Sequence, residues 1–311
     1  MKIVFLDART LGDVPNLGEL NALGQTILHP DTQLEQVAER IQGAEVVITN
    51  KVKVTREAMA STPTLKLICV AATGTNNVDL TAAHELGIQV KNVKGYSTDS
   101  VAQQTFALLF ALLNSTAYYD DYVKTGKYSN ERIFTHLGRP YWELNGKRFG
   151  ILGLGEIGRQ VARIALAFGA EVVYFSASGQ EYNVIYERLE LDEFLKTCDV
   201  ISIHAPLSAE TENLLNYARI SQMKPTALLL NTSRGGIVNE ADLAKALDDE
   251  LIAGAAIDVF TQEPISASHP YMQLQKKEKL LLAPHIAWSS IEARTRLVHK
   301  VAENIRGYLA G

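Results

Sequence analysis

A glycine-rich motif at residues 153–158 constrains the fold more than any other feature of this chain. Its sequence, Gly-Leu-Gly-Glu-Ile-Gly, follows a short apolar run at 148–152 and precedes a segment with helical periodicity. The first glycine permits a tight turn, the second lets the backbone approach a ligand, and the third lets the helix pack on the strand. Free N–H groups and the positive end of the helix favour phosphate. We therefore predict a dinucleotide site that includes Gly153, Gly155, Glu156, Ile157 and Gly158.

Composition and charge exclude several other classes of protein. The chain has 311 residues, 47% of them hydrophobic, and a formal net charge of −5, which gives no electrostatic case for nucleic acid. The apolar run Phe106–Leu113 is too short to span a bilayer, and Asp7 interrupts the N-terminal apolar run before a signal-peptide core forms. Cys69 and Cys198 lie in apolar runs far apart, which is typical of buried free thiols in a reducing compartment. We expect a cytoplasmic protein with no membrane partner and no metal site.

Short β-branched runs alternate with helical patterns through the chain, which predicts parallel sheets covered on both faces. In the first hundred residues the strand-like runs are Ile3–Leu6, Val46–Thr49, Leu67–Val70 and Ile88–Val90, with helical patterns at Gln33–Ile41 and Leu80–Leu86. A long helix is expected from Ser100 to about Val123. After the strand at 148–152 the strand-like runs are Val172–Phe175, Val200–Ile203, Ala227–Leu230, Gly254–Val259 and Leu280–Leu282.

The strand count predicts two domains. The second block holds six strands by Leu282, the number that a dinucleotide-binding sheet requires, so the apolar stripe of the last twenty residues is assigned to the first domain. The fold class is then α/β, with two Rossmann-like, doubly wound parallel-sheet domains. Residues 1–98 and 287–311 form a discontinuous, flavodoxin-like domain that binds substrate, and residues 99–286 form the dinucleotide-binding domain. A ligand is expected in a cleft between them.

Three polar residues follow consecutive strand-like runs in the second block: Arg234, Glu263 and His285. The carboxyl ends of parallel strands share one edge of a sheet, so these side chains are expected to converge there. A planar guanidinium can bridge the carboxylate and carbonyl of a 2-oxo acid. Histidine can donate a proton near neutral pH, and an adjacent carboxylate favours its charged form. Each residue alone also has a structural reading, as a turn or strand-end residue; the three together favour catalysis.

The motifs resemble those of the D-isomer-specific 2-hydroxyacid dehydrogenase family. In family order they are Gly153–Gly158, His204-Ala205-Pro206-Leu207, the run 231–238 from Asn231 to Val238, Asp258-Val259-Phe260 with Glu263-Pro264, and Pro284-His285-Ile286-Ala287. The resemblance implies that Arg234 binds substrate and that Glu263 pairs with His285, the acid/base. It also implies that backbone N–H groups around Thr73-Gly74 hold the substrate carboxylate, and that Asp258 bonds the nicotinamide amide. By the same resemblance, the other cofactor-binding residues are His204, Ala205, Pro206, Thr232 and Ser233.

One position departs from the usual NAD-binding pattern. An acidic residue ordinarily follows the second strand and binds the ribose diol, but here Val172–Phe175 is followed by Ser176. No carboxylate repels a 2′-phosphate, and no arginine in this turn attracts one. We therefore predict NAD, with NADP open as an alternative.

Within the family, the chain most resembles the glycerate dehydrogenase, or hydroxypyruvate reductase, branch, in residues 48–51, 93–98 and 134–140. Asn50 and Lys51 end a strand-like run and could face the third carbon of the substrate, or form an ordinary loop. The expected reaction reduces hydroxypyruvate or glyoxylate to D-glycerate or glycolate. The alternatives are a dinucleotide-sensing, corepressor-like binding module and a formate- or phosphite-type dehydrogenase.

A homodimer is expected, mainly because family dimers bury a region comparable to the loop 134–142. That loop contains His136, Arg139, Tyr141 and Trp142, and the preceding helix carries Tyr118, Tyr119 and Tyr122, which suit an interface. Packing of these tyrosines on their own domain is the competing explanation.

Overall fold

The computed structural model describes all 311 residues and divides into two compact units. Unit 1 comprises Met1–Ser97 and Trp288–Gly311, and unit 2 comprises Thr98–Ala287. Each unit is a wholly parallel sheet with helices on both faces, so the predicted doubly wound α/β class is confirmed. None of the helices combines the length and apolarity needed to cross a bilayer.

The sheet of unit 1 has five strands in the order β2-β1-β3-β4-β5. The four predicted strands are present, and the structure adds β2, an edge strand whose residues are not fully buried. Alternate residues of each central strand face opposite sides, so Ile3 and Phe5 enter one core while Val4 and Leu6 enter the other. The strand bounds are β1 Lys2–Phe5, β2 Gln25–Leu28, β3 Val46–Thr49, β4 Leu67–Val70 and β5 Gln89–Lys91.

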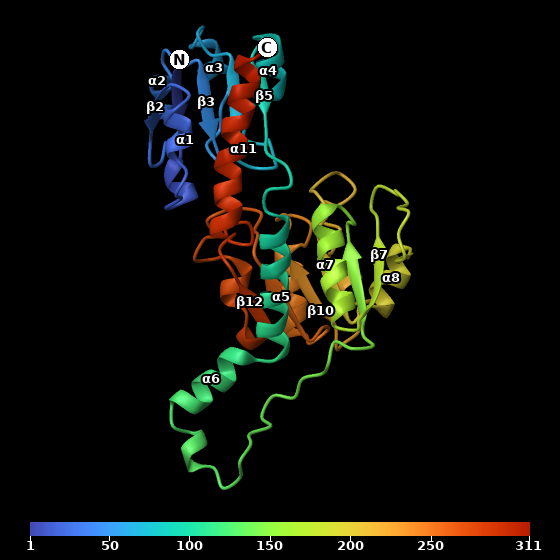
Figure 1. Cartoon of the computed structure of the whole chain (residues 1–311). Helices are drawn as coiled ribbons and strands as arrows, with labels where there is room; N and C mark the ends of the chain where they lie inside the picture. Colours follow the sequence, from blue (N-terminus) through green and yellow to red (C-terminus); the bar gives the residue numbers. More distant parts are fainter. The chain divides into compact units, whose positions relative to one another are not determined.

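Helices cover both faces of this sheet. The C-terminal helix α11 (Ile291–Leu309) lies along one face, where its apolar stripe joins the core that contains Ile3 and Phe5 (Figure 1). Ser290 caps this helix, because its hydroxyl accepts the N–H of Ala293 at 3.1 Å. The remaining helical segments of unit 1 are η1 Ala8–Leu11, α1 Gly18–Asn21, η2 Leu34–Gln36, α2 Val37–Arg40, α3 Arg56–Ala60 and α4 Leu80–Glu85.

The sheet of unit 2 has seven strands in the order β12-β11-β10-β9-β6-β7-β8. The six predicted strands are present, and β8 is a two-residue addition at one edge. Chain order reverses on either side of β6, which places a topological switch point between β6 and β9. The bounds are β6 Arg148–Leu152, β7 Glu171–Phe175, β8 Glu187–Arg188, β9 Val200–Ile203, β10 Leu228–Asn231, β11 Gly254–Ile257 and β12 Leu280–Leu282.

Two cores lie on the two faces of this sheet. Helices α5 (Thr98–Leu113) and α7 (Glu156–Ala167) pack on one face, and Figure 1 shows both against the strands. Helices α8 (Leu191–Thr197) and α10 (Glu240–Asp248) cover the other face. The remaining helical segments are α6 Thr116–Lys124, η3 Tyr128–Asn130, α9 Tyr217–Ile220, η4 Pro270–Gln273 and η5 Lys277–Lys279.

The expected single helix from Ser100 to Val123 is wrong. Ser115 has a φ of 50°, a left-handed conformation that ends α5 and starts α6 in a new direction. Residues 116–143, which we call the arm, project from the body of unit 2 (Figure 1). Inside the arm, the Tyr118 hydroxyl bonds His136 at 2.8 Å and the Tyr122 ring stacks on His136 with a centroid separation of 3.8 Å. The arm tyrosines therefore pack on their own chain.

Both cysteines are buried and unpaired, as predicted. Cys69 lies in β4, and Cys198 directly follows α8 (Leu191–Thr197). Burial raises the pKa of each thiol to about 12, because the thiolate would lose its hydration.

Candidate active site

The glycine motif forms a turn between β6 and α7. Gly153 has a φ of 95°, and a Cβ there would lie 2.6 Å from the backbone nitrogen of Ala205. A Cβ on Gly158 would lie 2.2 Å from the carbonyl oxygen of Gly153. Gly155 is different, because it precedes α7 at an ordinary φ of −75° and a Cβ would meet no protein atom within 4 Å. The chain itself thus requires two of the glycines, while the third leaves open space before the N-terminus of α7, where a pyrophosphate fits.

The segments after β9 and β10 lie beside this turn. The Ser233 hydroxyl donates to the carbonyl oxygen of Ala205 at 2.5 Å, and the buried hydroxyls of Thr105 and Thr232 are 3.0 Å apart. The predicted cofactor residues after these two strands are therefore brought together next to the glycine turn. Pro206 lies in the segment after β9, directly after Ala205, and its carbonyl oxygen accepts the Thr211 hydroxyl at 2.7 Å.

His204 is a neutral histidine in this region. Its Nε2 lies 2.8 Å from the Ser202 hydroxyl, and its buried Nδ1 has no hydrogen-bond partner. Burial lowers the pKa of His204 to about 3, since the charged ring would lose its hydration. His204 can therefore serve as a polar, uncharged element of the site.

The turn after β7 has no acidic residue near the expected ribose position. Ser176 directly follows β7 and is buried, and its hydroxyl lies 3.3 Å from the Ser178 hydroxyl. Glu156 and Ile157 occupy the first turn of α7. A hydroxyl pair can bond a ribose diol without repelling a phosphate on it, so the structure fits either dinucleotide.

Arg234 lies on a rigid turn after β10. The Asn231 side chain fixes this turn at both ends: its amide nitrogen donates to the Arg234 carbonyl oxygen at 2.9 Å, and its oxygen accepts the Ser233 N–H at 3.1 Å. The turn also lies directly against the segment after β11, since a Cβ on Gly235 would be 2.0 Å from the carbonyl carbon of Phe260. The loops that carry Arg234 and Glu263 are therefore in contact.

Glu263 and His285 form a hydrogen-bonded pair. Oε2 of Glu263 lies 2.7 Å from Nδ1 of His285, while Oε1 accepts the Phe260 N–H at 2.9 Å. One carboxylate oxygen thus fixes Glu263 to its own loop, and the other holds the imidazole of His285. The two side chains are 31% and 22% exposed, so the pair is accessible to a ligand.

Asp258 fixes the backbone around His285. His285 has a φ of 55°, which a residue other than glycine rarely adopts. The Asp258 carbonyl accepts the His285 N–H at 2.8 Å, and its carboxylate accepts the N–H groups of Ile286 and Ala287 at 2.8 and 2.9 Å. Burial raises the pKa of Asp258, and the two backbone N–H groups oppose that effect. This positioning contact adds to the nicotinamide contact that we expected for Asp258.

These groups share one edge of the sheet. Arg234, Glu263 and His285 follow β10, β11 and β12, which are adjacent and parallel, and the glycine turn follows β6 at the same edge. A guanidinium, an imidazole and a carboxylate at this edge can bind an anionic carbonyl compound and transfer a proton to its oxygen.

The residues predicted to bind substrate in the other domain follow β3 and β4 of unit 1. The Thr73 hydroxyl donates to the Val93 carbonyl at 3.1 Å, which fixes the turn that contains Gly74. Lys51 is exposed, whereas Asn50 is 4% exposed and its amide nitrogen donates to the Thr10 hydroxyl at 3.0 Å. Asn50 therefore holds the loop rather than offering that nitrogen to a ligand.

Sequence reasoning missed Asp7 as a part of this edge. Asp7 is 3% exposed, and its carboxylate accepts backbone N–H groups of residues 50–52. The available signal was an aspartate two residues after strand β1, a position from which a side chain reaches the loops at the carboxyl edge.

Known proteins are similar to this chain in both sequence and fold. A family model described as D-isomer specific 2-hydroxyacid dehydrogenase, NAD binding domain, matches residues 106–287. The chain is 38% identical to the hydroxypyruvate reductase of Blautia hydrogenotrophica, covering 100% of this chain and 98% of the relative. It is 35% identical to the glycerate dehydrogenase of Methylorubrum extorquens, covering 100% and 96%.

A solved structure of a D-lactate dehydrogenase has the same fold. D-lactate dehydrogenase from Aquifex aeolicus, complexed with NAD and lactic acid, matches with a TM-score of 0.86 at 27% identity, covering 100% of this chain and 96% of that one. These relatives do not favour a dinucleotide-sensing module or a formate- or phosphite-type dehydrogenase.

Proposed function

Because the chain belongs to the D-isomer-specific 2-hydroxyacid dehydrogenase family, we propose that it reduces hydroxypyruvate or glyoxylate to D-glycerate or glycolate. The similarity to a hydroxypyruvate reductase and a glycerate dehydrogenase along the whole chain supports this choice of substrate. The observation that carries the proposal is the Glu263–His285 pair, 2.7 Å apart, at the sheet edge shared with Arg234 and the glycine turn.

Each residue of the trio has a distinct role in the proposed reaction. The Arg234 guanidinium binds the substrate carboxylate and orients the adjacent carbonyl. His285 donates a proton to the carbonyl oxygen, and Glu263 stabilises the charged imidazole and fixes its orientation. When bound, the dinucleotide supplies the hydride to the carbonyl carbon. Asp258 bonds the nicotinamide amide and holds the His285 backbone.

Unit 1 supplies the substrate-binding domain in this proposal, and unit 2 the dinucleotide-binding domain. Backbone N–H groups at Thr73 and Gly74 bind the substrate carboxylate, since a glycine-bearing turn after a strand suits an anion. Lys51 faces the third carbon, and the buried Asn50 supports the loop that carries Lys51.

The cofactor is NAD(H) in this proposal, with NADP(H) as the alternative that Ser176 leaves open. Titration of the protein with each reduced dinucleotide, followed by fluorescence, tests the preference. Tighter binding of NADPH by ten-fold or more would reverse the assignment.

Replacement of His285 tests the chemistry. His285→Ala should abolish most turnover of hydroxypyruvate and leave the NADH dissociation constant nearly unchanged, because the imidazole acts on the proton and not on the dinucleotide. His299→Ala is a matched control, since His299 is also paired with a glutamate, Glu19, at 2.9 Å, but on the exposed surface of α11. Full activity of His285→Ala, or loss of NADH binding by it, would contradict the assigned role.

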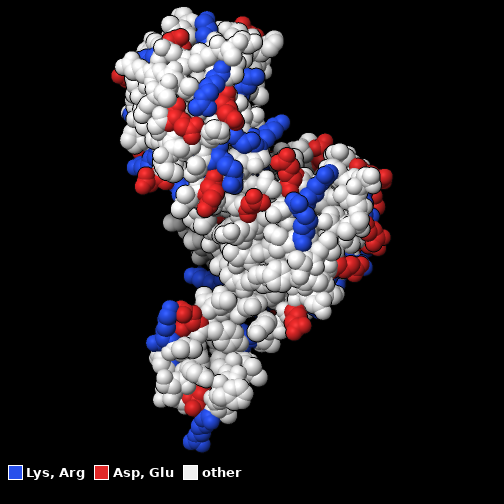
Figure 2. Space-filling view, in the orientation of Figure 1, with Lys and Arg blue, Asp and Glu red and all other residues white.

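We also propose a homodimer in which the arm packs on a second copy. Several apolar side chains of the arm are exposed although its tyrosines are engaged internally, and Figure 2 shows a mostly uncharged surface there. The exposed residues include Ile133 at 63%, Phe134 at 90% and Leu137 at 81%. Light scattering should give twice the chain mass for the wild type and the single mass for the double variant Phe134→Ser, Leu137→Ser. A monomeric wild type would refute the dimer.

The two buried, unpaired thiols support a reducing, cytoplasmic setting for the protein.

A further inference from the structure

The Asp7 carboxylate accepts three consecutive backbone N–H groups of the loop that follows β3. Its Oδ1 accepts the Asn50 N–H at 2.8 Å, and its Oδ2 accepts the N–H groups of Lys51 and Val52 at 2.7 and 3.2 Å. Consecutive N–H groups that converge in this way ordinarily bind an anion. Because Asp7 is 3% exposed, its carboxylate is a fixed internal anion, and no ligand is needed to hold the loop.

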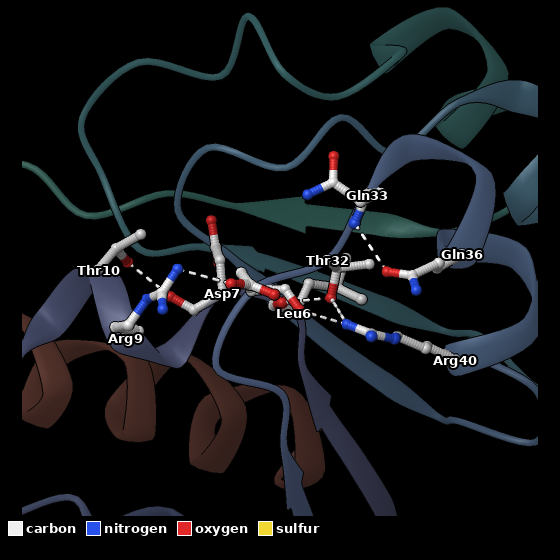
Figure 3. Close-up of polar contacts among 9 residues, drawn as sticks. Leu6, Asp7, Arg9, Thr10, Thr32, Gln33, Gln36 and Arg40 are labelled. Atoms are coloured by element: carbon white, nitrogen blue, oxygen red, sulfur yellow. Dashed lines mark hydrogen bonds and ion pairs between the residues drawn. The ribbon is translucent and has the colours of Figure 1, made fainter. Parts of the chain in front are cut away.

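Further hydrogen bonds, from Thr10 and Asn77, hold the loop at residues 50–52. The Thr10 hydroxyl donates to the Asp7 carbonyl oxygen at 2.7 Å and accepts from the Asn50 amide at 3.0 Å. Figure 3 shows Asp7 and Thr10 close together just beyond β1, with Thr32 on the other side of Leu6. The Asn77 amide donates to the Val52 carbonyl oxygen at 3.1 Å and closes the far end of the loop. The backbone on both sides of Lys51 is therefore held by buried or partly buried groups.

We propose that Asp7 is a positioning residue for substrate selection. The Asp7 carboxylate holds the backbone N–H groups of residues 50–52 and so fixes the backbone position of Lys51 at the carboxyl edge of the five-stranded sheet. Lys51 then favours 2-oxo acids that carry a hydroxyl on the third carbon over those without a third carbon, because an ammonium can donate to that hydroxyl. The inference rests on the proposed function and deepens it by naming the residue that sets the preference.

The test compares two substrates that differ at the third carbon. Hydroxypyruvate has a hydroxymethyl group there, and glyoxylate has no third carbon. Asp7→Asn should lower the ratio of kcat/KM for hydroxypyruvate to that for glyoxylate by roughly ten-fold or more, mostly through KM, because a charge-assisted anchor becomes a weaker one. The NADH dissociation constant should not change, since the glycine turn lies in unit 2.

Thr32→Val is the matched control. The Thr32 hydroxyl donates to the carbonyl oxygen of Leu6, the residue before Asp7, so its loss disturbs the same strand end without touching the loop at 50–52. The substrate ratio should stay at the wild-type value in this variant even if its thermal stability falls. An equal change of ratio in Thr32→Val and Asp7→Asn would show a general effect of destabilisation and would overturn the proposal.

Two further variants make the outcome decisive. Asp7→Ala removes the carboxylate, and added formate should restore the substrate ratio by occupying the vacated N–H groups, with no effect on the wild type. Lys51→Met keeps the length of the side chain without its charge and should reproduce the loss of ratio, even if the Asp7 variants do not fold. An unchanged ratio in Lys51→Met overturns the proposal. Inactivity of the wild type toward both acids would instead refute the proposed function itself.

Discussion

Gly155 offers a way to separate ligand binding from folding at the dinucleotide site. In Gly155→Ala the new methyl group would meet no protein atom within 4 Å, and the φ of −75° suits alanine. Alanine is a poorer helix N-cap than glycine by several tenths of a kcal/mol, but it lowers the entropy of the unfolded chain by about 0.4–1 kcal/mol, so the two effects nearly cancel. We expect the free energy of unfolding to change by no more than about 0.5 kcal/mol.

Binding should respond differently. The methyl group would occupy the space before α7 that the motif leaves for a pyrophosphate, and steric overpacking costs about 1–3 kcal/mol. That cost corresponds to a dissociation constant for NADH that is roughly 5- to 150-fold higher. Fluorescence titration with NADH measures the binding, and thermal unfolding monitored by circular dichroism measures the stability of the same sample.

Gly158→Ala is the contrasting variant. Its methyl group would lie 2.2 Å from the Gly153 carbonyl oxygen, so the helix must shift from the strand. An overpacking cost of about 1–3 kcal/mol lowers the melting temperature of a domain of this size by roughly 2–12 °C. Wild-type affinity of Gly155→Ala for NADH would refute the placement of the pyrophosphate. Unfolding of Gly155→Ala to the same extent as Gly158→Ala would show that the space is not open.

Three more predictions follow from single side chains. Glu263→Gln should lower the rate of reduction roughly 10²-fold at neutral pH, since an amide cannot stabilise the charged imidazole of His285; a wild-type steady-state rate would contradict the pairing. The pKa of His204 is about 3 in the folded protein and about 6.5 when unfolded, so the unfolded state binds more protons below pH 6.5 and stability falls as the pH drops. By pH 5 this loss is about 2 kcal/mol, and urea unfolding at pH 7 and pH 5 should show a smaller loss for His204→Gln than for the wild type. Because burial raises the pKa of Cys69 and Cys198 to about 12, neither should react with a thiol reagent at pH 8 until denaturant is added; rapid reaction of the native protein would show that a thiol is accessible.

The central strands were predictable from sequence because burial on both faces selects continuous β-branched runs. Val46–Thr49 and Leu67–Val70 are buried at every position and coincide with β3 and β4. The edge strand β2 has two exposed residues, and β8 has only two residues, so neither leaves such a run. The break at Ser115 was missed because apolar and aromatic residues continue on both sides of it, although the run Asn114-Ser115-Thr116 consists of residues that favour helix ends and caps.

The candidate site was also only partly predictable from the sequence. Arg234, Glu263 and His285 were identified because each follows a strand, and parallel strands end at one edge. The supporting contacts were not identified. The contact of Gly235 with Phe260, and the bonds from the Asp258 carboxylate to the backbone after His285, join segments far apart in the chain. Such contacts depend on tertiary geometry that residue type and spacing do not specify.

The position of α11 determines the order in which the two units can be completed during synthesis. Unit 2 is one continuous segment, Thr98–Ala287, so all its strands are translated before α11. Unit 1 completes the burial of one face of its sheet with residues of α11, which are translated after unit 2: Leu297, Val298, Val301 and Ile305. The N-terminal segment of unit 1 therefore keeps one apolar face of its sheet incompletely covered until α11 is made. The domain that begins first along the chain is completed last, and the nascent chain is most prone to aggregate during that interval.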